Sequence, residues 1–571
     1  MIAPARVCGL LAALVLAAPA AAAGTFYVSP SGSDAGPGSA AQPWKTLQHA
    51  ADVVGPDDTV IVLPGHYAGF NLFTSGAAGS PITFTAEPGA EAANPLVVID
   101  GNNPFTDKDR INLEGASYVV IEGFTVPGTG DPDTNRAGIR TVGFPDDPAR
   151  FVTLRANRCD QNGRWGILTG HVDDLLIEDN ECSRAAAEHG IYVGNSGDRP
   201  VVRRNVVWGN HSNGLHMNGD LSLGGDGVIS DALVERNVLY GNGDGDPAFG
   251  APGGSAINCD GVVDSVIQNN LLYDNHKSGI SLYRIDGGAP STGNRVLANT
   301  VHNASDARFA LNIKDGSGGN LVANNVLLND HSSRGSIDIE SDCLPGFICD
   351  YNALEESFGL DGAFLSFAAW KAATGADAHS FLTTPSQTFV GAAAGDYQLA
   401  PGSAAKDSAD PATSPPEDLL GKLRPAGAGF DRGAYELGAC FGSSSSYGAG
   451  APGSGGFVPL LAASGCPDAG GVLTVSLAQG LGGAPAWLAA GAQALDLPFL
   501  GGKLLVQPQL LFPAVLGGAS GAPGAGAAAL ALPIPDDPSL SGASAFLQGF
   551  VLDPGAGALG ALTAGLALVL G

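Results

Sequence analysis

The chain has 571 residues, of which 44% are apolar and only 15% are charged, with 84 glycines and 38 prolines. So few charged residues exclude a coiled coil or a long solvated helix, and so many glycines and prolines favour short strands joined by turns. The formal net charge of −29 and the absence of a basic run exclude nucleic acid as a partner.

Residues 1–23 have the pattern of a secretory signal peptide, in which Arg6 precedes an apolar run and small residues precede Gly24. The apolar run is shorter than the roughly 20 residues that a membrane helix needs, and no later run reaches that length. We therefore expect an exported protein, extracellular or on the cell surface, with no membrane span. We also expect it to act as a monomer.

The cysteines that follow the signal peptide predict two disulfides, since export permits such bonds. Cys343 and Cys349 flank a short loop, and Cys440 and Cys466 bracket a stretch rich in Gly and Ser.

A repeat occupies the middle of the chain, in which short segments centred on an asparagine recur at intervals of 23 to 33 residues. The asparagines are Asn157, Asn180, Asn205, Asn237, Asn270, Asn299 and Asn325. About ten residues after most of them comes a small residue and an alternating strand, as in GILTG, GIYVG, GLHMN and GISLY. Such strands cannot bury their apolar side alone, so successive turns must stack. The repeat predicts a parallel β-helix, in which each asparagine bonds the next and tolerates a left-handed turn.

The region from Thr25 to Glu436 resembles the secreted right-handed parallel β-helix family that includes the pectate-lyase-like polysaccharide lyases. The resemblance lies in the opening FYVSPSGSDAGPGSAAQPWKTLQHAADVVGPDDTVIVLPGHY and in the closing segments DYQLAPGSAAKDSADP and GFDRGAYE. It implies an all-β solenoid whose N-terminal end is capped by an amphipathic helix over Trp44 to Val53. The resemblance identifies the fold more closely than the activity, because this architecture also serves hydrolases, epimerases and non-catalytic adhesins.

The composition divides the chain further. We expect the N-terminal cap and first coils in residues 24–95, the β-helix in 96–352 and a closing segment of the solenoid in 353–440. A Gly/Ser linker over 441–456 would then lead to a small β-sandwich-like domain in 457–571, which lacks Arg, Glu and His. This last region resembles a domain appended to exported bacterial proteins.

If the residue after each small residue points inward, two columns of side chains face outward along one sheet. The first column runs through Arg140, Leu168, Tyr192, His216, Asn258, Ser281, Asn312 and Asp338. The second runs through Val142, Gly170, Gly194, Asn218, Asp260, Tyr283, Lys314 and Glu340. The columns are polar from His216 to Glu340. Two insertions, Asp220 to Ser230 and Asn242 to Gly254, should stand beside this face and wall a groove.

The groove suggests a lyase that acts by β-elimination on an acidic polysaccharide. This reaction needs a base for the C5 proton and a positive charge against the uronate carboxylate. Lys314 is the candidate base, Arg284 would pair with the carboxylate and Tyr283 would donate to the leaving oxygen. His216 and Asp260 would share the catalytic groove, and the substrate would be held by three amides, Asn218, Asn258 and Asn312.

Calcium is the expected cofactor. Asp338, Glu340 and Asp342 alternate along one strand and offer the hard oxygen ligands that calcium prefers. The resemblance points the same way, because lyases of this fold use a Lys or Arg base with acidic calcium ligands.

Two other functions remain open. Asp338 and Glu340 would lie about 6.6 Å apart along their strand, a spacing that suits the two carboxylates of a glycoside hydrolase. Alternatively, Lys314 and Glu340 form only a surface ion pair, and the protein is a non-catalytic carbohydrate-binding or adhesion protein.

Overall fold

A computed structural model describes residues 23–571, except 88–95, 107, 251–252, 439–441, 465–466, 470–471, 536 and 557–559. The chain forms two compact units. One comprises residues up to Ala323 with Leu327–Asp350 and Leu354–Ala378, and the other comprises Asn324–Val326, Tyr351–Ala353 and His379–Gly571. Within the described ranges, no helix is long and apolar enough to cross a membrane.

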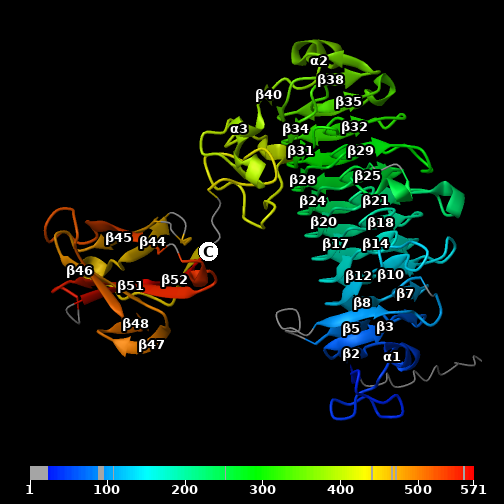
Figure 1. The fold of residues 1–571 in the computed structure, drawn as a ribbon. Helices are drawn as coiled ribbons and strands as arrows, with labels where there is room; N and C mark the ends of the chain where they lie inside the picture. Colours follow the sequence, from blue (N-terminus) through cyan, green and yellow to red (C-terminus); the bar gives the residue numbers. More distant parts are fainter. Residues whose placement is uncertain are drawn as a thin grey trace, which may run out of the picture. The chain divides into compact units, whose positions relative to one another are not determined.

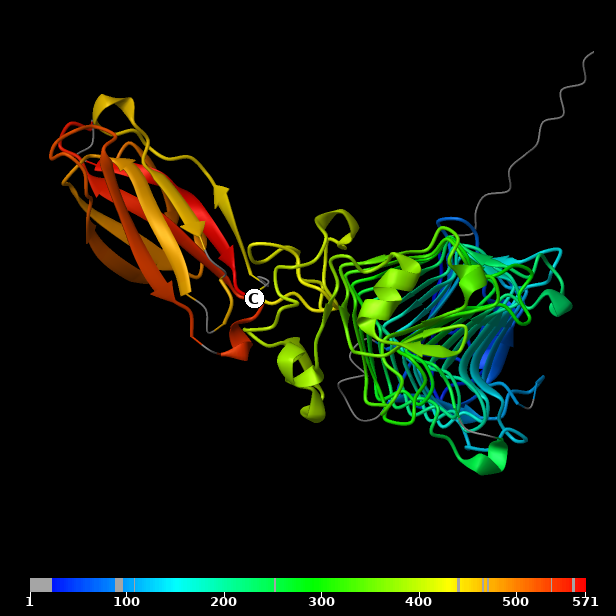
Figure 2. The same cartoon turned by 90° about the horizontal axis from the view of Figure 1, so that it is seen from above.

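The first unit is a right-handed parallel β-helix, as the repeat predicts (Figure 1). Its chain passes repeatedly through three long sheets, and Figure 2 looks down the axis of the stacked coils. The segments GLHMN and GISLY contribute β21 (Leu215–Asn218) and β29 (Ile280–Tyr283) to the same parallel sheet. The architecture predicted from the asparagine repeat is therefore confirmed.

The first sheet is ordered β1 (Thr25–Val28), β2 (Thr59–Val62), β5 (Ile82–Ala86), β8 (Val119–Glu122), β12 (Val152–Arg155), β16 (Leu176–Glu178), β19 (Val201–Arg203), β23 (Leu233–Glu235), β27 (Val266–Gln268), β30 (Arg295–Leu297), β33 (Leu321–Ala323) and β36 (Ile348–Asp350). The second sheet, called the groove sheet below, is ordered β4 (Phe70–Leu72), β7 (Ile111–Glu114), β10 (Ala137–Val142), β14 (Trp165–Gly170), β18 (Ile191–Gly194), β21, β25 (Ile257–Asp260), β29, β32 (Leu311–Ile313), β35 (Ile337–Ile339), β38 (Phe358–Leu360) and β39 (Ala363–Leu365).

The third sheet runs from β3 (Gly65–Ala68) through β6 (Val97–Gly101), β9 (Thr125–Pro127), β13 (Arg158–Asp160), β17 (Glu181–Ser183), β20 (Val206–Trp208), β24 (Val238–Tyr240), β28 (Leu271–Tyr273) and β31 (Thr300–Asn303) to β34 (Val326–Asn329). Two short pairs lie between the sheets, β11 (Ala149–Arg150) with β15 (Val172–Asp173) and β22 (Ile229–Ser230) with β26 (Val262–Val263).

Inward side chains stack in columns along the axis and form one continuous core. On the groove sheet, Ile167, Ile191, Leu215 and Ile257 are register partners and are almost fully buried. Burying each aliphatic side chain of this size contributes about 1.5–3 kcal/mol, so every coil depends on its neighbours for stability.

The cysteines behave as core residues. Cys159 and Cys182 are register partners on β13 and β17, and both are buried thiols. The disulfide expected between Cys343 and Cys349 is wrong: the thiol of Cys343 donates to Asp342, and that of Cys349 donates to Asp377. Cys440 and Cys466 lie outside the described residues.

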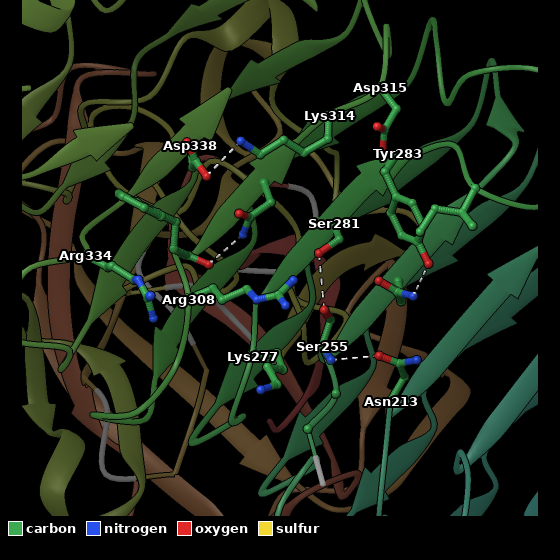
Figure 3. A pocket seen from close by; sticks show the side chains of 16 residues that line it. Asn213, Ser255, Lys277, Ser281, Tyr283, Arg308, Lys314, Asp315, Arg334 and Asp338 are labelled. Atoms are coloured by element: carbon green, nitrogen blue, oxygen red, sulfur yellow. Dashed lines mark hydrogen bonds and ion pairs between the residues drawn. The ribbon is translucent and has the colours of Figure 1, made fainter. Parts of the chain in front are cut away.

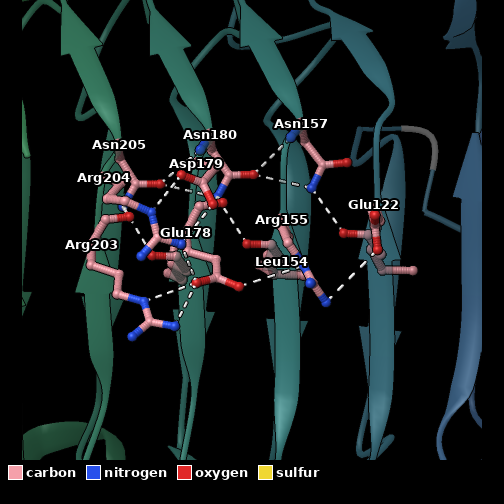
Figure 4. A network of polar contacts seen from close by, with 12 residues as sticks. Glu122, Leu154, Arg155, Asn157, Glu178, Asp179, Asn180, Arg203, Arg204 and Asn205 are labelled. Carbon is pink, nitrogen blue, oxygen red and sulfur yellow. Dashed lines mark hydrogen bonds and ion pairs between the residues drawn. The ribbon is translucent and has the colours of Figure 1, made fainter. Parts of the chain in front are cut away.

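The repeated asparagines form a buried ladder at the turn between the first and third sheets (Figure 4). Asn157 Nδ2 donates to Asn180 Oδ1 at 3.1 Å, and Asn180 Nδ2 donates to Asn205 Oδ1 at 3.1 Å. The left-handed residue of each turn is the one before the asparagine, as at Asp179 and Arg204, rather than the asparagine itself. The asparagine is needed for its amide, which satisfies buried backbone groups that a tight turn leaves without partners.

Ion pairs join neighbouring coils beside this ladder. Glu178 is contacted by Arg203 at 2.8 Å, by Arg204 at 2.7 Å and by Arg155 at 3.5 Å, and Arg204 also binds Asp179 (Figure 4). Most arginines in this part of the solenoid are thus neutralised by carboxylates from an adjacent coil.

Helices cover the two ends of the solenoid core. The N-terminal helix α1 (Leu47–Val53) is shorter than expected, because the side chain of Thr46 caps it by accepting from His49 N at 3.2 Å. It buries Leu47 and Ala50, and Gln48 binds the backbone of Asn71 on the edge strand β4. At the other end, α2 (Phe367–Thr374) buries Trp370, which stacks on Phe358.

Strand β37 (Ala353–Leu354) is divided between the two units. From His379 on, the second unit contains β40 (Phe381–Leu382), α3 (Pro385–Thr388) and the antiparallel pair β41 (Phe389–Gly391) and β42 (Asp396–Leu399). Its C-terminal part is sandwich-like, with one sheet of five antiparallel strands, one of three and a hairpin. The strands are β43 (Ser443–Tyr447), β44 (Leu460–Ser464), β45 (Val472–Gly480), β46 (Pro485–Gly491), β47 (Ala494–Phe499), β48 (Gly502–Val506), β49 (Leu510–Val515), β50 (Gly526–Pro533), β51 (Ser544–Leu552) and β52 (Gly560–Val569).

This C-terminal part has its own core, to which β45, β46 and β51 contribute Val475, Leu488 and Val551. The expected linker is wrong for Ser443–Tyr447, because this segment forms β43 and pairs along β52. Its serines are small and exposed, so the strand is held by backbone hydrogen bonds that composition does not reveal.

Candidate functional site

The solenoid carries a pocket of about 540 Å³ over the C-terminal half of the groove sheet (Figure 3). Its floor consists of outward side chains from β25, β29, β32 and the start of β35, namely Asn258, Ser281, Tyr283, Asn312 and Asp338. Lys314 and Asp315, which directly follow β32, lie at one side. The in-and-out pattern of the sequence therefore predicts the floor correctly.

Lys314 lies in this pocket, but its ammonium group is engaged. Lys314 Nζ is 3.0 Å from Asp338 Oδ2 and 3.8 Å from Glu340 Oε1 (Figure 3). The lysine is about one quarter exposed, so the pair is partly shielded from water. The contact with Asp338 must break before Lys314 can act on a ligand.

Tyr283 presents a hydroxyl group suited to donating a proton. Its oxygen accepts from Asn258 Nδ2 at 2.7 Å, which leaves the hydroxyl hydrogen for another acceptor. Burial raises the pKa of Tyr283 well above its ordinary value, and the nearby charge of Asp260 raises it further. The phenol therefore keeps its proton at neutral pH.

Asp260 lies outside the pocket, and its position corrects the expected catalytic role. Its carboxylate is 2% exposed and accepts the backbone N–H groups of Ile285, Asp286 and Gly287 at 2.9 to 3.0 Å. A carboxylate with three such donors holds the turn after β29 in place. The expected grouping of Asp260 with Lys314 is therefore wrong.

Arg284, His216 and Asn218 also lie away from the pocket. Arg284 is exposed and donates to the carbonyl of Gly287 at 3.1 Å, because the turn after β29 carries it past the sheet edge. His216 pairs with His189, and Asn218 donates to the hydroxyl of Tyr192 at 3.0 Å. Alternation predicts that His216 and Asn218 face outward, but not that neighbouring side chains cover them.

The predicted calcium ligands do not converge. Asp338 binds Lys314, Glu340 Oε2 accepts from Asp315 N at 3.0 Å, and Asp342 accepts from the thiol of Cys343. Over the described ranges, no three His, Cys, Asp or Glu side chains are grouped to hold a metal ion. The strand ends at Ile339, so Glu340 and Asp342 do not continue its alternation and the expected metal site is wrong.

One of the two insertions borders the pocket. Gly253 and Gly254, at the end of the second insertion, line it, and Gly254 is packed against the backbone of Ser212. The first insertion lies instead beside the turn after β29, where Leu221 N donates to Asp286 O at 2.9 Å. The second insertion thus walls the pocket as expected, whereas the expectation that the first does so is wrong.

Sequence reasoning missed three cations that form one side of the pocket, Lys277, Arg308 and Arg334. Each stands three residues before the first residue of its strand, in the segments KSGI, RFAL and RGSI. Because those strand residues are register partners, the three cations form a column on consecutive coils (Figure 3). A basic residue at this fixed offset was the signal that could have revealed them.

The same column continues toward the N-terminus, where its cations are neutralised. Arg136 pairs with Asp109, and Arg164 lies 3.4 Å from Glu188. Arg334 donates to the carbonyl of Ala307 at 3.2 Å. Among the residues that the structure describes, none of the three cations beside the pocket has a carboxylate partner within 4 Å.

Comparisons with known proteins find similarity to parts of the chain. The family described as "Periplasmic copper-binding protein (NosD)" matches residues 149–338, a range that contains every pocket residue. A protein of Bacillus subtilis (strain 168), described as "Uncharacterized protein YwoF", is 26% identical over 442 residues, which is 67% of this chain and 92% of that protein.

Two solved structures are similar over 72% of this chain. Pectate lyase Pel9A is 15% identical with a TM-score of 0.49 and is covered over 96% of its length. XylC in complex with xylose is 10% identical with a TM-score of 0.42 and is covered over 98%.

Proposed function

We propose that this protein binds an acidic polysaccharide in the pocket and cleaves it by β-elimination. The observation that carries the proposal is the column of Lys277, Arg308 and Arg334, which line the pocket and have no carboxylate partner in the described part of the chain. Three cations on consecutive coils repel one another, and an anionic ligand bound in the pocket would relieve that repulsion. Amide and hydroxyl groups of Asn258, Ser281 and Asn312 line the same pocket, as recognition of sugar hydroxyls requires.

The residues in the pocket can supply the steps of an elimination. A cation of the column would bind the uronate carboxylate and so make the C5 proton more acidic. Lys314 would accept that proton, and the electrons of the C–H bond would form the C4–C5 double bond. The C4–O4 bond would break as Tyr283 donates its hydroxyl proton to O4. Arg308 takes the role that the sequence assigns to Arg284.

Non-catalytic binding is the second candidate function. The 3.0 Å contact of Lys314 with Asp338 favours it, because a lysine held as an ammonium ion cannot accept a proton. A hydrolase is less well supported, because Asp338 and Glu340 both contact Lys314 instead of standing as an acid and a base.

Copper, which the matched family is described as binding, does not fit the buried imidazoles of the matched segment. His189 Nδ1 accepts Asn213 N at 3.2 Å, so its hydrogen sits on Nε2, which donates to His216 Nδ1 at 3.0 Å. Both nitrogens that approach each other are thereby used in a hydrogen bond. Calcium on Asp338, Glu340 and Asp342 is not retained, because Lys314 lies between the first two carboxylates and, over the described residues, no three such side chains are grouped to hold a metal ion.

The test is incubation with polygalacturonate, alginate, hyaluronan and neutral dextran, with binding and ultraviolet absorbance of unsaturated products both measured. We expect binding and absorbance with at least one acidic polymer and neither with dextran. Lys314→Ala should abolish product formation, while Lys45→Ala, at an exposed lysine outside the pocket, should not change it.

The outcomes separate the candidates. Binding without unsaturated product would leave the non-catalytic function, and no binding to any acidic polymer would overturn the proposal. Arg308→Ala should weaken binding about tenfold, since a charge-assisted hydrogen bond contributes about 1.5–3 kcal/mol. We further propose that the protein is exported and acts as a monomer on polysaccharide outside the cell.

A further inference from the structure

Two histidines form a buried pair beside the pocket. His189 precedes β18 and is 7% exposed, and His216 lies on β21. His189 Nε2 and His216 Nδ1 are 3.0 Å apart, and the ring of Tyr192 stacks on His189 at a centroid distance of 5.6 Å. Nothing in the proposed chemistry uses this pair.

The hydrogen bonds fix one protonation state for the pair. The backbone N–H of Asn213 donates to His189 Nδ1 at 3.2 Å, so this nitrogen carries no hydrogen. His189 is then protonated on Nε2 and donates to His216 Nδ1. A further proton on either ring places one N–H group against another and breaks one of these two bonds.

The pair is connected to the pocket through Asn213. The backbone N–H of Asn213 is held by His189, and its side-chain Oδ1 accepts the backbone N–H of Ser255 at 2.7 Å (Figure 3). The hydroxyl of Ser255 is 3.2 Å from that of Ser281. Asn213, Ser255 and Ser281 all line the pocket, and Asn213 and Ser255 are less than a tenth exposed.

We infer that His189 is a positioning residue: its unprotonated Nδ1 anchors Asn213, and through it Ser255, as one wall of the ligand pocket. Protonation of His189 turns this acceptor into a donor, which repels the N–H of Asn213 and releases the wall. The consequence for ligand affinity rests on the proposed function, whereas the anchoring itself does not.

The groups around His189 determine that it becomes protonated only at acidic pH. Burial, followed by the nearby His216 and His211, lowers the pKa of His189 well below its ordinary value. Burial lowers the pKa of His216 to about 4. Glu188 Oε2 is 3.7 Å from His189 Nε2, but Arg164 neutralises that carboxylate, and burial raises the pKa of Glu188. The wall is therefore anchored at neutral pH.

The test compares His189→Asn, His189→Ala and wild type by amide hydrogen exchange of the full chain at about pH 7 and about pH 4.5. An asparagine Oδ1 can replace the imidazole Nδ1 as an acceptor but does not titrate. We expect at least tenfold lower protection of Asn213 and Ser255 in wild type at acid pH, and at both pH values in His189→Ala. His189→Asn should keep its protection at both. His66→Phe, at an exposed histidine, serves as the control.

Equal loss of protection in His189→Asn and wild type at acid pH would overturn the inference, because other groups would then cause it. Unchanged protection in a folded His189→Ala would also overturn it. Affinity for the acidic polysaccharide that binds best should follow the same pattern. If wild type binds no acidic polysaccharide but the exchange pattern holds, the proposed function fails and the anchoring role stands.

Discussion

Replacing Asn237 by alanine should destabilise the solenoid strongly. The Asn237 side chain is 1% exposed and makes four hydrogen bonds. Nδ2 donates to Val202 O and Asn270 Oδ1, and Oδ1 accepts from the backbone and side-chain nitrogens of Asn205. Each bond contributes about 1 kcal/mol net, and a buried group left without a partner costs about 1–3 kcal/mol. We therefore expect a loss of about 4 kcal/mol in the free energy of unfolding.

Urea denaturation followed by far-ultraviolet circular dichroism measures this loss as a shift of the transition midpoint. Gln42→Ala, which removes an exposed amide side chain, is the matched control and should change stability by less than about 0.5 kcal/mol. A loss for Asn237→Ala no larger than that of Gln42→Ala would refute the reasoning. It would mean that core packing alone sets the spacing of the coils.

Asp260→Asn should loosen the turn after β29, because the amide nitrogen of the new side chain would face a backbone N–H donor where a carboxylate oxygen now accepts. Tryptic cleavage after Arg284 should then be faster, and an unchanged cleavage rate would contradict this. Cys182 should not react with a thiol reagent until the chain unfolds, since burial raises its pKa well above the ordinary value, and reaction of the native protein would contradict this. His216, with its pKa lowered to about 4, is neutral in the fold while the unfolded chain binds a proton below about pH 6.5. His216 should therefore contribute a fall of about 3 kcal/mol in the free energy of unfolding between about pH 6.5 and 4. His216→Phe should remove this contribution, which denaturation at each pH measures against wild type.

The fold could be predicted because the features that specify it repeat. The asparagines mark one turn of each coil, and small residues before alternating strands mark the groove sheet, so the floor residues Asn258, Ser281 and Asn312 follow from register alone. A period of two fixes which side of a strand faces outward.

Only the floor of the site could be predicted from the sequence, because the other site residues lie in turns before or after the strands. Asp260 and Arg284 were expected in the groove, yet the turn after β29 takes both of their side chains as hydrogen-bonding partners. The cations Lys277, Arg308 and Arg334 precede their strands, where alternation has no meaning. Their common offset of three residues was visible. The structure was needed to show that, among the described residues of this column, these three have no carboxylate partner whereas Arg136 and Arg164 have one.

A crystal structure of the protein with a bound uronate oligosaccharide tests the central claim most directly. We expect at least one carboxylate of the sugar to contact Lys277, Arg308 or Arg334, with a sugar ring over Asn258 and Tyr283. An oligosaccharide bound elsewhere on the solenoid, with these three side chains unengaged, would contradict it.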